Sequence, residues 1–566
     1  MKVTQWLAAV FALLVIAWST GVPAQQHNQE QPNVLLVVAD DLGYSDLGVF
    51  GSEIATPHID ALASDSVVFT NFHANATCTP SRAMLLTGID NHTVGYGANP
   101  IVAKRFPAIR GKPAYRGEFT DGTRLLAQYF AEAGYATSMA GKWHLGRNPD
   151  SWPPARGYER SYFFENGGAS HFADRMGNLD IESPVEYWEG EKPAPALPED
   201  FYSTTFYTDK LIAYIEAGVE SGRPFFAHLS YTAPHWPLQA PDGWRDRYSG
   251  AYDQGWATVR SKRIARMIEI GLLDEATPVS PLPDQLGDWS ELTDAQKRSE
   301  ARRMELYAAM VSHLDQEFGR LVKFLKDIGE YNNTIIVLLS DNGPEGNDVM
   351  ALRNNSDWVP QNFDLSYENM GRSGSYVWQG RSWAHVSATP LRLYKSFLSE
   401  GGIRVPAIMK LPGSKEARQH RQFASVMDIA PTLLEAARIP LGEGEQMMGV
   451  SLLTSPVKGE EQGAARAVAM EIYGGKVVFE GRWKLMWAWP PFGEGEWKLY
   501  DIEKDPGETQ DLSAQNTAIV SRLATVWYQY IKANGIYEAD HDFGYGRYPD
   551  QLGRTSAEKT ASGNGR

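Results

Sequence analysis

The chain has 566 residues, of which 43% are hydrophobic, and it contains 17 Trp and 26 Tyr, so it can bury a large core and is too long for one small domain. Its formal net charge of −16 argues against nucleic acid as a partner, because nucleic-acid binding requires a basic face. The charge does not exclude an anionic substrate, since a local basic pocket can lie within an acidic surface.

The N-terminus has the pattern of a targeting segment. Lys2 precedes an apolar run from Trp6 to Trp18, and Val22-Pro23-Ala24 offers small residues for cleavage. The run is shorter than the ~20 residues that a membrane span requires. We therefore expect residues 1–24 to be a signal peptide, with an uncleaved anchor as the less favoured possibility, and we find no other stretch apolar enough to span a bilayer.

The single cysteine, Cys78, indicates the compartment. An exported chain with one cysteine forms no intramolecular disulfide, so its fold must rest on its core. The triplet Asn75-Ala76-Thr77 lies too close to Cys78 to suit a glycan. Together these features favour a bacterial periplasmic or secreted protein, with a monomer as the default state.

The first apolar run, Val34 to Ala39, ends abruptly in Asp40-Asp41. A continuous run of this kind is typical of a strand buried on both faces, hence a central strand of an α/β sheet. In such sheets ligands gather beyond the carboxyl ends of strands. Two adjacent carboxylates there suit a divalent cation such as calcium, although a lone Asp-Asp pair is more often a polar turn or a helix cap.

Cys78 begins a short polar run that we predict to be the start of a helix. Pro80 suits a first helical turn, and the residues from Ala83 to Leu86 are good helix formers. At a helix N-terminus, free backbone N–H groups and the helix dipole favour an anion, and Arg82 adds a planar cation suited to oxyanions. The pattern indicates a nucleophile at an anion site; the alternative is an inert, buried cysteine.

A second buried strand is predicted over Thr334 to Ser340, and it ends in Asp341-Asn342-Gly343. Before it, apolar residues spaced three and four apart from Tyr307 to Leu325 predict a helix. This is an α/β repeat whose strand ends at the same edge as the first strand. Oxygen ligands from the two strand ends would form a metal site that residue 78 completes.

Two further predicted strands lead into basic residues. Ala136 to Met139 precedes Gly141-Lys142-Trp143-His144, and Phe225 to Leu229 precedes Ala233-Pro234-His235. Lys395 lies five residues before Glu400. Taken singly, each of these residues is more often a surface lysine or a satisfied histidine than a catalyst.

Together the motifs resemble those of the type I sulfatases. The family signature Cys-x-Pro-Ser-Arg-x-x-x-Leu-Thr-Gly, whose cysteine a maturation enzyme oxidises to Cα-formylglycine, is matched in full from Cys78 to Gly88. The strand-end motifs above, and Lys395-x-x-x-x-Glu-Gly-Gly-Ile-Arg-Val-Pro, occur in family order. The resemblance extends from Asn33 to about Leu512 and is closest to the bacterial aryl- and alkylsulfatases.

The resemblance implies the site and the fold. It implies an α/β fold like that of alkaline phosphatase, with a large mixed, mostly parallel sheet flanked by helices. It implies one calcium ion held by Asp40, Asp41, Asp341, Asn342 and the formylglycine derived from Cys78. It further implies that Arg82 and Lys142 steady the formylglycine hydrate, that Lys142 and Lys395 hold sulfate oxygens, that His144 bonds to the hydrate, and that His235 faces the leaving oxygen.

The implied reaction is hydrolysis of aryl or alkyl sulfate monoesters. A calcium-activated hydroxyl of the hydrate attacks sulfur, and the second hydroxyl lets the carbon expel sulfate after His144 takes its proton. A phosphonate or phosphate ester hydrolase is the runner-up, because relatives share this arrangement. The motifs are also compatible with a sulfate-ester binding protein that is never matured and with a cysteine hydrolase.

The substrate pocket is harder to predict. Residues 346–390 lack clean periodicity and lie between two motif segments, so we expect a loop that borders the pocket. Tyr376, Trp378 and Trp383 are candidate walls for an apolar group, with ordinary packing under a long loop as the alternative.

The remaining chain predicts two domains and a tail. We expect residues 31–455 to form the α/β catalytic domain, closed by a helical segment from Phe423 to Arg438. Residues 456–540 are predicted to form a small antiparallel sheet with a helix from about Asn516 to Asn534. The Gly-, Ser- and Thr-rich residues 541–566 are predicted to be a mobile tail.

Overall fold

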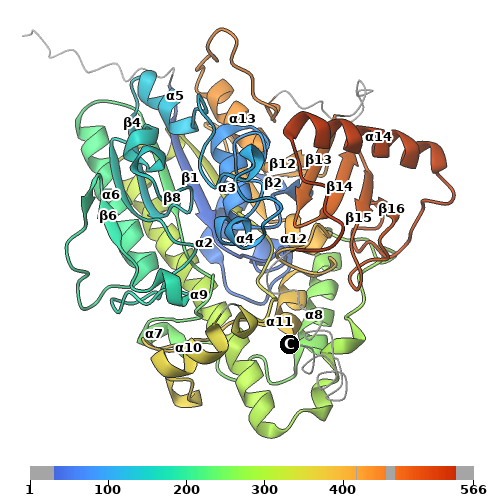
Figure 1. The fold of residues 1–566 in the computed structure, drawn as a ribbon. Helices are drawn as coiled ribbons and strands as arrows, with labels where there is room; N and C mark the ends of the chain where they lie inside the picture. The colour runs from blue at the N-terminus through green and yellow to red at the C-terminus, as the bar shows by residue number, and fades with distance from the viewer. Residues whose placement is uncertain (1–30, 353, 416, 454–465, 544–566) are drawn as a thin grey trace, which may run out of the picture.

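The computed structural model describes residues 31–352, 354–415, 417–453 and 466–543. A ten-stranded sheet with helices on both faces fills most of this structure, and a separate four-stranded antiparallel sheet follows near the C-terminus (Figure 1). The predicted signal peptide lies outside the described residues, as do the predicted boundary after residue 455 and most of the predicted tail. None of the helices in these ranges is long and apolar enough to cross a membrane.

The large sheet is mixed. Its strands follow the order β11 (Arg418–His420), β2 (Val67–Phe69), β10 (Ala407–Lys410), β9 (Thr334–Ser340), β1 (Asn33–Ala39), β8 (Phe225–Ser230), β4 (Ala136–Lys142), β5 (Arg160–Phe164), β6 (Tyr187–Glu189) and β7 (Lys192–Pro193). The strands from β9 to β5 are parallel, whereas β10, β6 and β7 run antiparallel to their neighbours. The predicted mixed, mostly parallel sheet is therefore confirmed.

Helices cover both faces because the central strand β1 is apolar on both sides. Val34, Leu36 and Val38 pack into one core cluster, and Leu35 and Val37 pack into the other. The first face is covered by α3 (Cys78–Thr87), α5 (Leu126–Glu132) and α13 (Ile429–Ala436), and the second by α2 (Pro57–Ala63), α6 (Ser203–Glu220) and α9 (Asp294–Asp327). The prediction that this run is buried on both faces is confirmed.

Two helices differ in length from their predictions. The helix predicted over 307–325 is part of the longer α9, which a Thr293–Gln296 capping box starts earlier. The segment predicted as helical over 423–438 begins three residues later, because residues 424 and 425 pair as strand β12 (Ala424–Ser425) with β3 (Phe72–His73). A 3-10 turn (Val426–Asp428) then leads into α13. The other α-helices are α4 (Pro100–Arg105), α7 (Asp242–Arg245), α8 (Trp256–Glu269), α10 (Asn355–Asn362), α11 (Arg381–Ser387), α12 (Glu400–Ile403) and α14 (Thr517–Asn534).

The C-terminal sheet lies beside the large one and is drawn in red in Figure 1. It consists of β13 (Ala467–Ile472), β14 (Gly475–Glu480), β15 (Trp483–Trp487) and β16 (Trp497–Asp501). Val478 and Leu485 on one face pack against Trp527 of α14. The opposite face, with Val477 and Phe479, joins the core cluster of the large sheet. The predicted antiparallel sheet and its helix are confirmed.

A buried polar cluster joins the loop after α3 to the C-terminal sheet and α14. His92 Nε2 lies 2.8 Å from Glu471 Oε2 on β13, and the Tyr530 hydroxyl of α14 donates to Asp90 over 2.8 Å. Burial disfavours the imidazolium form of His92, but its hydrogen bonds to Asp90 and Glu471 outweigh this and raise its pKa to about 9. His92 is therefore charged at neutral pH and contributes to this contact.

This cluster predicts a dependence of stability on pH. The pKa of His92 is raised above its unfolded value, so its contribution is complete below the unfolded pKa of ~6.5 and is lost as pH rises through the folded pKa of about 9. The shift corresponds to roughly 3 kcal/mol. In denaturant titrations, the unfolding free energy of His92→Gln should decrease less than that of wild type as the pH rises from about 6.5 to about 9. His541→Gln, at an exposed site, is the control. If the unfolding free energy of His92→Gln falls with pH as steeply as that of wild type, the raised pKa of His92 is contradicted.

Candidate active site

The two metal-binding motifs meet because β1 and β9 are adjacent parallel strands. Ala39 pairs with Ser340 at their carboxyl ends, so the residues that follow lie side by side. Asn342 Nδ2 donates to Asp41 Oδ1 over 2.7 Å, and the Asp41 backbone N–H donates to Asp341 Oδ1 over 3.4 Å. The predicted convergence of the two strand ends is confirmed.

Cys78 lies at the same edge, at the first residue of α3, as predicted. Its Sγ, a carboxylate oxygen of Asp40, one of Asp41 and a ring nitrogen of His235 all lie within 4.8 Å of one another. The side chain is buried, and burial raises the pKa of the thiol to about 12 despite the nearby Lys142 and Lys395. The cysteine is therefore a neutral thiol rather than a thiolate at physiological pH.

Three buried cations each pair with one of the acidic residues. Lys142 Nζ at the end of β4 lies 2.7 Å from Asp40 Oδ2, and Lys395 Nζ lies 2.7 Å from Asp41 Oδ1. Arg82 Nε, one turn into α3, lies 2.8 Å from Asp341 Oδ2. Burial opposes ionisation of Asp40, but Lys142, His235 and Arg82 hold its pKa well below the usual range. The site is thus a network of paired charges excluded from water.

His235 has a defined tautomer in this network. Its Nδ1 lies 2.6 Å from the carbonyl oxygen of Trp236, which only an N–H can approach, so Nδ1 carries a proton. Nε2 faces the site, 3.6 Å from Asp41 Oδ2. Burial lowers the pKa of His235 to about 4, so the ring is neutral and Nε2 presents a lone pair to the site. Nε2 can donate a proton only when the ring is protonated.

His144 lies in the left-handed region, with φ of 57°, in the turn that follows β4. Its Nδ1 is buried without a hydrogen-bond partner in the part of the chain that the structure describes. Burial, with Lys142 and Arg82 close by, holds its pKa well below the usual value. A neutral histidine held in this way is suited to accept a proton.

The oxygen atoms of the site suit a hard cation. Asp40 Oδ1 and Asn342 Oδ1 are both buried, and neither has a hydrogen-bond partner among the described residues. Leaving buried polar atoms unpaired costs roughly 1–3 kcal/mol each, which a bound ion would recover. Carboxylate and amide oxygens are the ligands that calcium prefers. The residues present therefore fit the predicted ion.

Comparisons with known proteins identify the family. The model described as Sulfatase matches residues 32–439, most of the chain. The chain belongs to the sulfatase family. As a sulfatase it is a sulfuric ester hydrolase, and the predicted hydrolysis of sulfate esters is confirmed at that level. A second model, described as N-sulphoglucosamine sulphohydrolase, C-terminal, matches residues 392–531.

Individual relatives agree with the family. An arylsulfatase of Klebsiella aerogenes is 37% identical over 459 residues, covering 80% of this chain and 97% of the relative. An uncharacterized sulfatase of Schizosaccharomyces pombe is also 37% identical, over 92% of this chain and 97% of its own length. The crystal structure of Ps i-CgsB in complex with k-i-k-neocarrahexaose shares the fold, with a TM-score of 0.66 at 23% identity over 91% of this chain and 95% of its own.

The sulfatase has a cavity of about 600 Å³, part of it open to solvent, beside these residues. Cys78, His144, His235 and Lys395 line its inner end. Its apolar lining consists of Ile101, Val102, Leu179, Trp236 and Leu352. The cavity therefore joins a charged reactive end to an apolar wall that suits the alcohol part of an ester.

None of the three predicted aromatic walls lines this cavity. Trp383 is fully buried and donates to the Glu300 carbonyl, and Trp378 lies under the Arg303 guanidinium at 4.2 Å. Tyr376 packs behind Trp236, with ring centroids 5.6 Å apart. The loop predicted over residues 346–390 is also wrong in part, because the segment contains helices α10 and α11. The aromatic prediction failed because composition does not say which side chains of a segment face the pocket.

The structure also adds residues that the sequence motifs did not indicate. Glu345 Oε2 lies 3.4 Å from Lys395 Nζ, and the Arg82 guanidinium donates to Ser230 Oγ over 2.5 Å. Ser230 ends β8, so the rule that functional residues follow parallel strands was an available signal. Asn178 donates to the Trp236 carbonyl over 2.9 Å and lines the cavity, but it comes from an irregular loop that carries no motif.

The corrected wall makes a prediction for substrate binding. Leu352→Ala removes apolar contact area from the cavity, so we expect KM for aryl sulfates to rise roughly 5- to 30-fold, as for the loss of about 1–2 kcal/mol of binding. Trp378→Ala is the comparison, because this side chain packs against the apolar cluster that contains Leu352 but does not line the cavity. Its KM should rise less than that of Leu352→Ala. A larger effect from Trp378→Ala than from Leu352→Ala would reverse the assignment.

Proposed function

We propose that this sulfatase hydrolyses aryl or alkyl sulfate monoesters with a formylglycine derived from Cys78 and one calcium ion. The observation that carries the proposal is the buried cluster in which Cys78 Sγ, two carboxylates and His235 lie within 4.8 Å of one another, among three paired cations. Asp40, Asp41, Asp341, Asn342 and the modified residue 78 would hold the ion. Bound together, the hydrated formylglycine and the calcium ion supply an activated oxygen nucleophile, a second hydroxyl for sulfate release, and positive charge at the sulfuryl oxygens.

The chain's own cations orient the ester. Lys142 and Lys395 are buried beside Asp40 and Asp41, and their ammonium groups can donate to sulfuryl oxygens that enter the cavity. Arg82 is held by Asp341 and Ser230 and so keeps a fixed direction at the start of α3. Because these groups are excluded from water, each charge acts with little screening.

The two histidines handle protons on opposite sides of the reaction. His235 Nε2 faces the site and, as imidazolium or together with Lys395, stabilises the leaving oxygen. His144 is kept neutral by burial and can take a proton from the hydroxyl group of residue 78. Burial lowers the pKa of both rings, so their positions in the site, and not their pKa values, distinguish the two roles.

Specific measurements separate this function from its competitors. A cysteine hydrolase needs a thiolate, which the raised pKa of Cys78 disfavours. The phosphonate monoester hydrolase of Agrobacterium radiobacter shares the fold at a TM-score of 0.53 and 19% identity. To test the same activity here, kcat/KM for an aryl sulfate should be compared with kcat/KM for an aryl phosphodiester. Turnover by protein made together with the maturation enzyme would dismiss an unmatured binding protein.

The test of the proposal is the mass of the tryptic peptide that contains residue 78, from protein purified from its own host. A loss of about 18 Da relative to cysteine indicates the aldehyde. Exposure to a chelator should abolish turnover and lower the thermal midpoint, and calcium should restore both. An unmodified thiol in active protein would overturn the proposed nucleophile.

We also propose that residues 1–24 direct export to the periplasm and that the mature protein is a monomer.

A further inference from the structure

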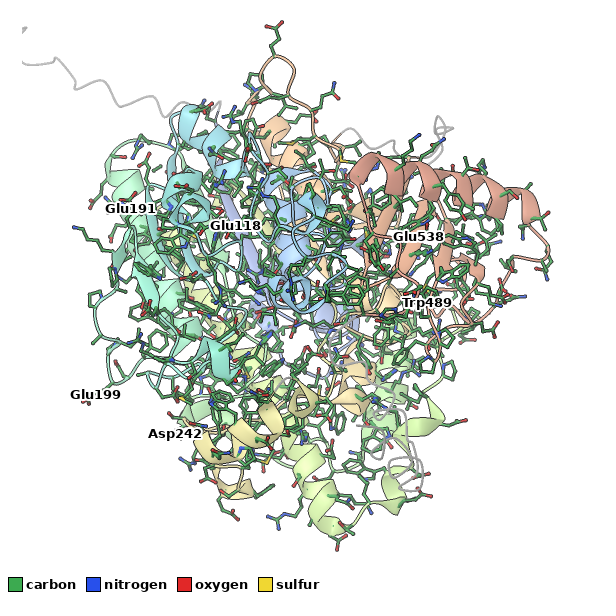
Figure 2. All side chains as sticks on the ribbon, viewed as in Figure 1. Glu118, Glu191, Glu199, Asp242, Trp489 and Glu538 are labelled. Carbon is green, nitrogen blue, oxygen red and sulfur yellow. The ribbon has the colours of Figure 1, made fainter. Side chains whose placement is uncertain are left out.

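A second cavity opens directly beside the first. The two cavities share the lining residues Asn99, Ile101, His144 and Glu182, so they lie side by side. The second cavity encloses about 830 Å³, part of it open to solvent, and Glu118, labelled in Figure 2, lies on its wall. A substrate that reacts at residue 78 can therefore extend into the second cavity.

The second cavity gathers basic side chains. It is lined by Lys104, Arg110, Arg116 and Arg147, in a protein whose formal net charge is −16. Arg110 is positioned by its own guanidinium, which donates to the Lys104 carbonyl over 2.6 Å. Such a concentration of cations next to an active site is unexpected on an acidic protein unless it meets an anion.

Three glutamates, Glu118, Glu165 and Glu182, also line the second cavity. Glu182 accepts from Arg147 over 2.9 Å, and Glu118 accepts from the Ser151 hydroxyl over 2.5 Å. Glu165 has no such bond within the described part of the chain, but burial and neighbouring glutamates raise its pKa to about 7, against the opposing effect of Arg147. It is therefore only partly charged at neutral pH.

The cations are less well compensated. Arg116 pairs at 3.4 Å with Asp121, whose side chain is 98% exposed. Within the described ranges, neither Lys104 nor Arg110 has a carboxylate partner. The lining of the second cavity therefore carries four cations against three glutamates, of which Glu165 is only partly charged.

We propose that the second cavity is a subsite for a further oxyanion of the substrate, so that the substrate class is a sulfate ester whose alcohol part carries a second sulfate or a carboxylate. This inference rests on the proposed function. Helix α4 fits the role, because it presents Ile101 and Val102 to the first cavity and Lys104 to the second. The apolar residues line the space for a hydrocarbon spacer, and the planar guanidinium of Arg110 suits the oxygens of sulfate or carboxylate.

The experiment compares matched substrates on the matured enzyme. The probes are bis-sulfates of linear diols from butanediol to dodecanediol, the alkyl monosulfates of the same length, and the corresponding ω-carboxyalkyl sulfates. At low ionic strength we expect kcat/KM for the best bis-sulfate to exceed that of its monosulfate by about tenfold, and the ratio to fall with added salt. The carboxylate series distinguishes a general oxyanion subsite from one that prefers sulfate.

Variants assign the effect to the cavity. The double variant Lys104→Gln/Arg110→Gln should bring the ratio close to one, whereas Lys112→Gln, an exposed residue of the same segment that lines neither cavity, should keep it. Thermal unfolding checks that each variant folds, and Arg116→Gln replaces the double variant if that one does not. The subsite is overturned if the ratio of kcat/KM between bis-sulfate and monosulfate is near one for wild type at every chain length, or if this ratio is unchanged in the double variant. In either case, turnover of the monosulfates leaves the proposed function standing. Failure of the matured enzyme on all esters overturns both.

Discussion

Replacing Cys78 with Ala is expected to lower kcat by ~10⁴-fold or more, because alanine provides neither a thiol nor a precursor of formylglycine at the position proposed for the nucleophile. The change removes one small buried side chain, so the thermal midpoint should fall only slightly. Measurements of kcat with an aryl sulfate and of thermal unfolding on the same preparation separate the two effects.

A matched test uses the matured wild type. If residue 78 carries an aldehyde, alkylation with a thiol reagent leaves turnover unchanged, because no thiol remains to react. Turnover by Cys78→Ala within a few-fold of wild type would show that the nucleophile lies elsewhere. Loss of turnover by alkylation would favour the cysteine hydrolase.

Lys484→Met is expected to lower the unfolding free energy by roughly 3–5 kcal/mol, because it removes the cation paired with buried Glu508 and leaves buried Glu400 with only Arg404 and His73 as partners. Lys484 on β15 has no exposed surface, and its Nζ lies 2.8 Å from Glu400 Oε1, 2.7 Å from Glu508 Oε1 and 2.7 Å from the Leu398 carbonyl. Leu398 and Glu400 follow Lys395 in the chain, so the same variant should also lower kcat by loosening that segment.

The control for this prediction lies on the next strand. Lys476 on β14 pairs at 3.1 Å with Glu538, a half-exposed residue labelled in Figure 2. Lys476→Met should therefore cost less than Lys484→Met, because the carboxylate it leaves unpaired stays in contact with water. Chemical denaturation of both variants and of wild type gives the comparison. Equal losses in the two variants would show that the network around Lys484 is not what fastens the C-terminal sheet to the large one.

Much of the catalytic cluster was predictable because its signals are local. The run from Val34 to Ala39 predicts a buried strand from six residues, and the polar residues after it follow from the rule about strand ends. Pro80 and the helix formers after it place Cys78 at a helix N-terminus without any distant contact. All the residues predicted for the calcium site and for catalysis lie at this one edge of the sheet.

The pocket wall was not predictable because packing partners decide it. Trp383 and Leu352 lie in the same segment between two motifs, yet Trp383 on α11 is buried among Tyr252 and Trp256 while Leu352 lines the cavity. The shortening of α13 has the same kind of cause, since β12 pairs with a strand more than three hundred residues earlier.

The sequence by itself determined the strands, the helix that begins at Cys78 and the chemical types at the reactive end, because periodicity, β-branched runs and capping residues act over a few neighbouring positions. The tertiary structure alone decided the tautomer of His235, the pairing of each lysine with its aspartate, the apolar lining and the basic second cavity. These depend on contacts between segments hundreds of residues apart, whose geometry is fixed only when both faces of the sheet are packed.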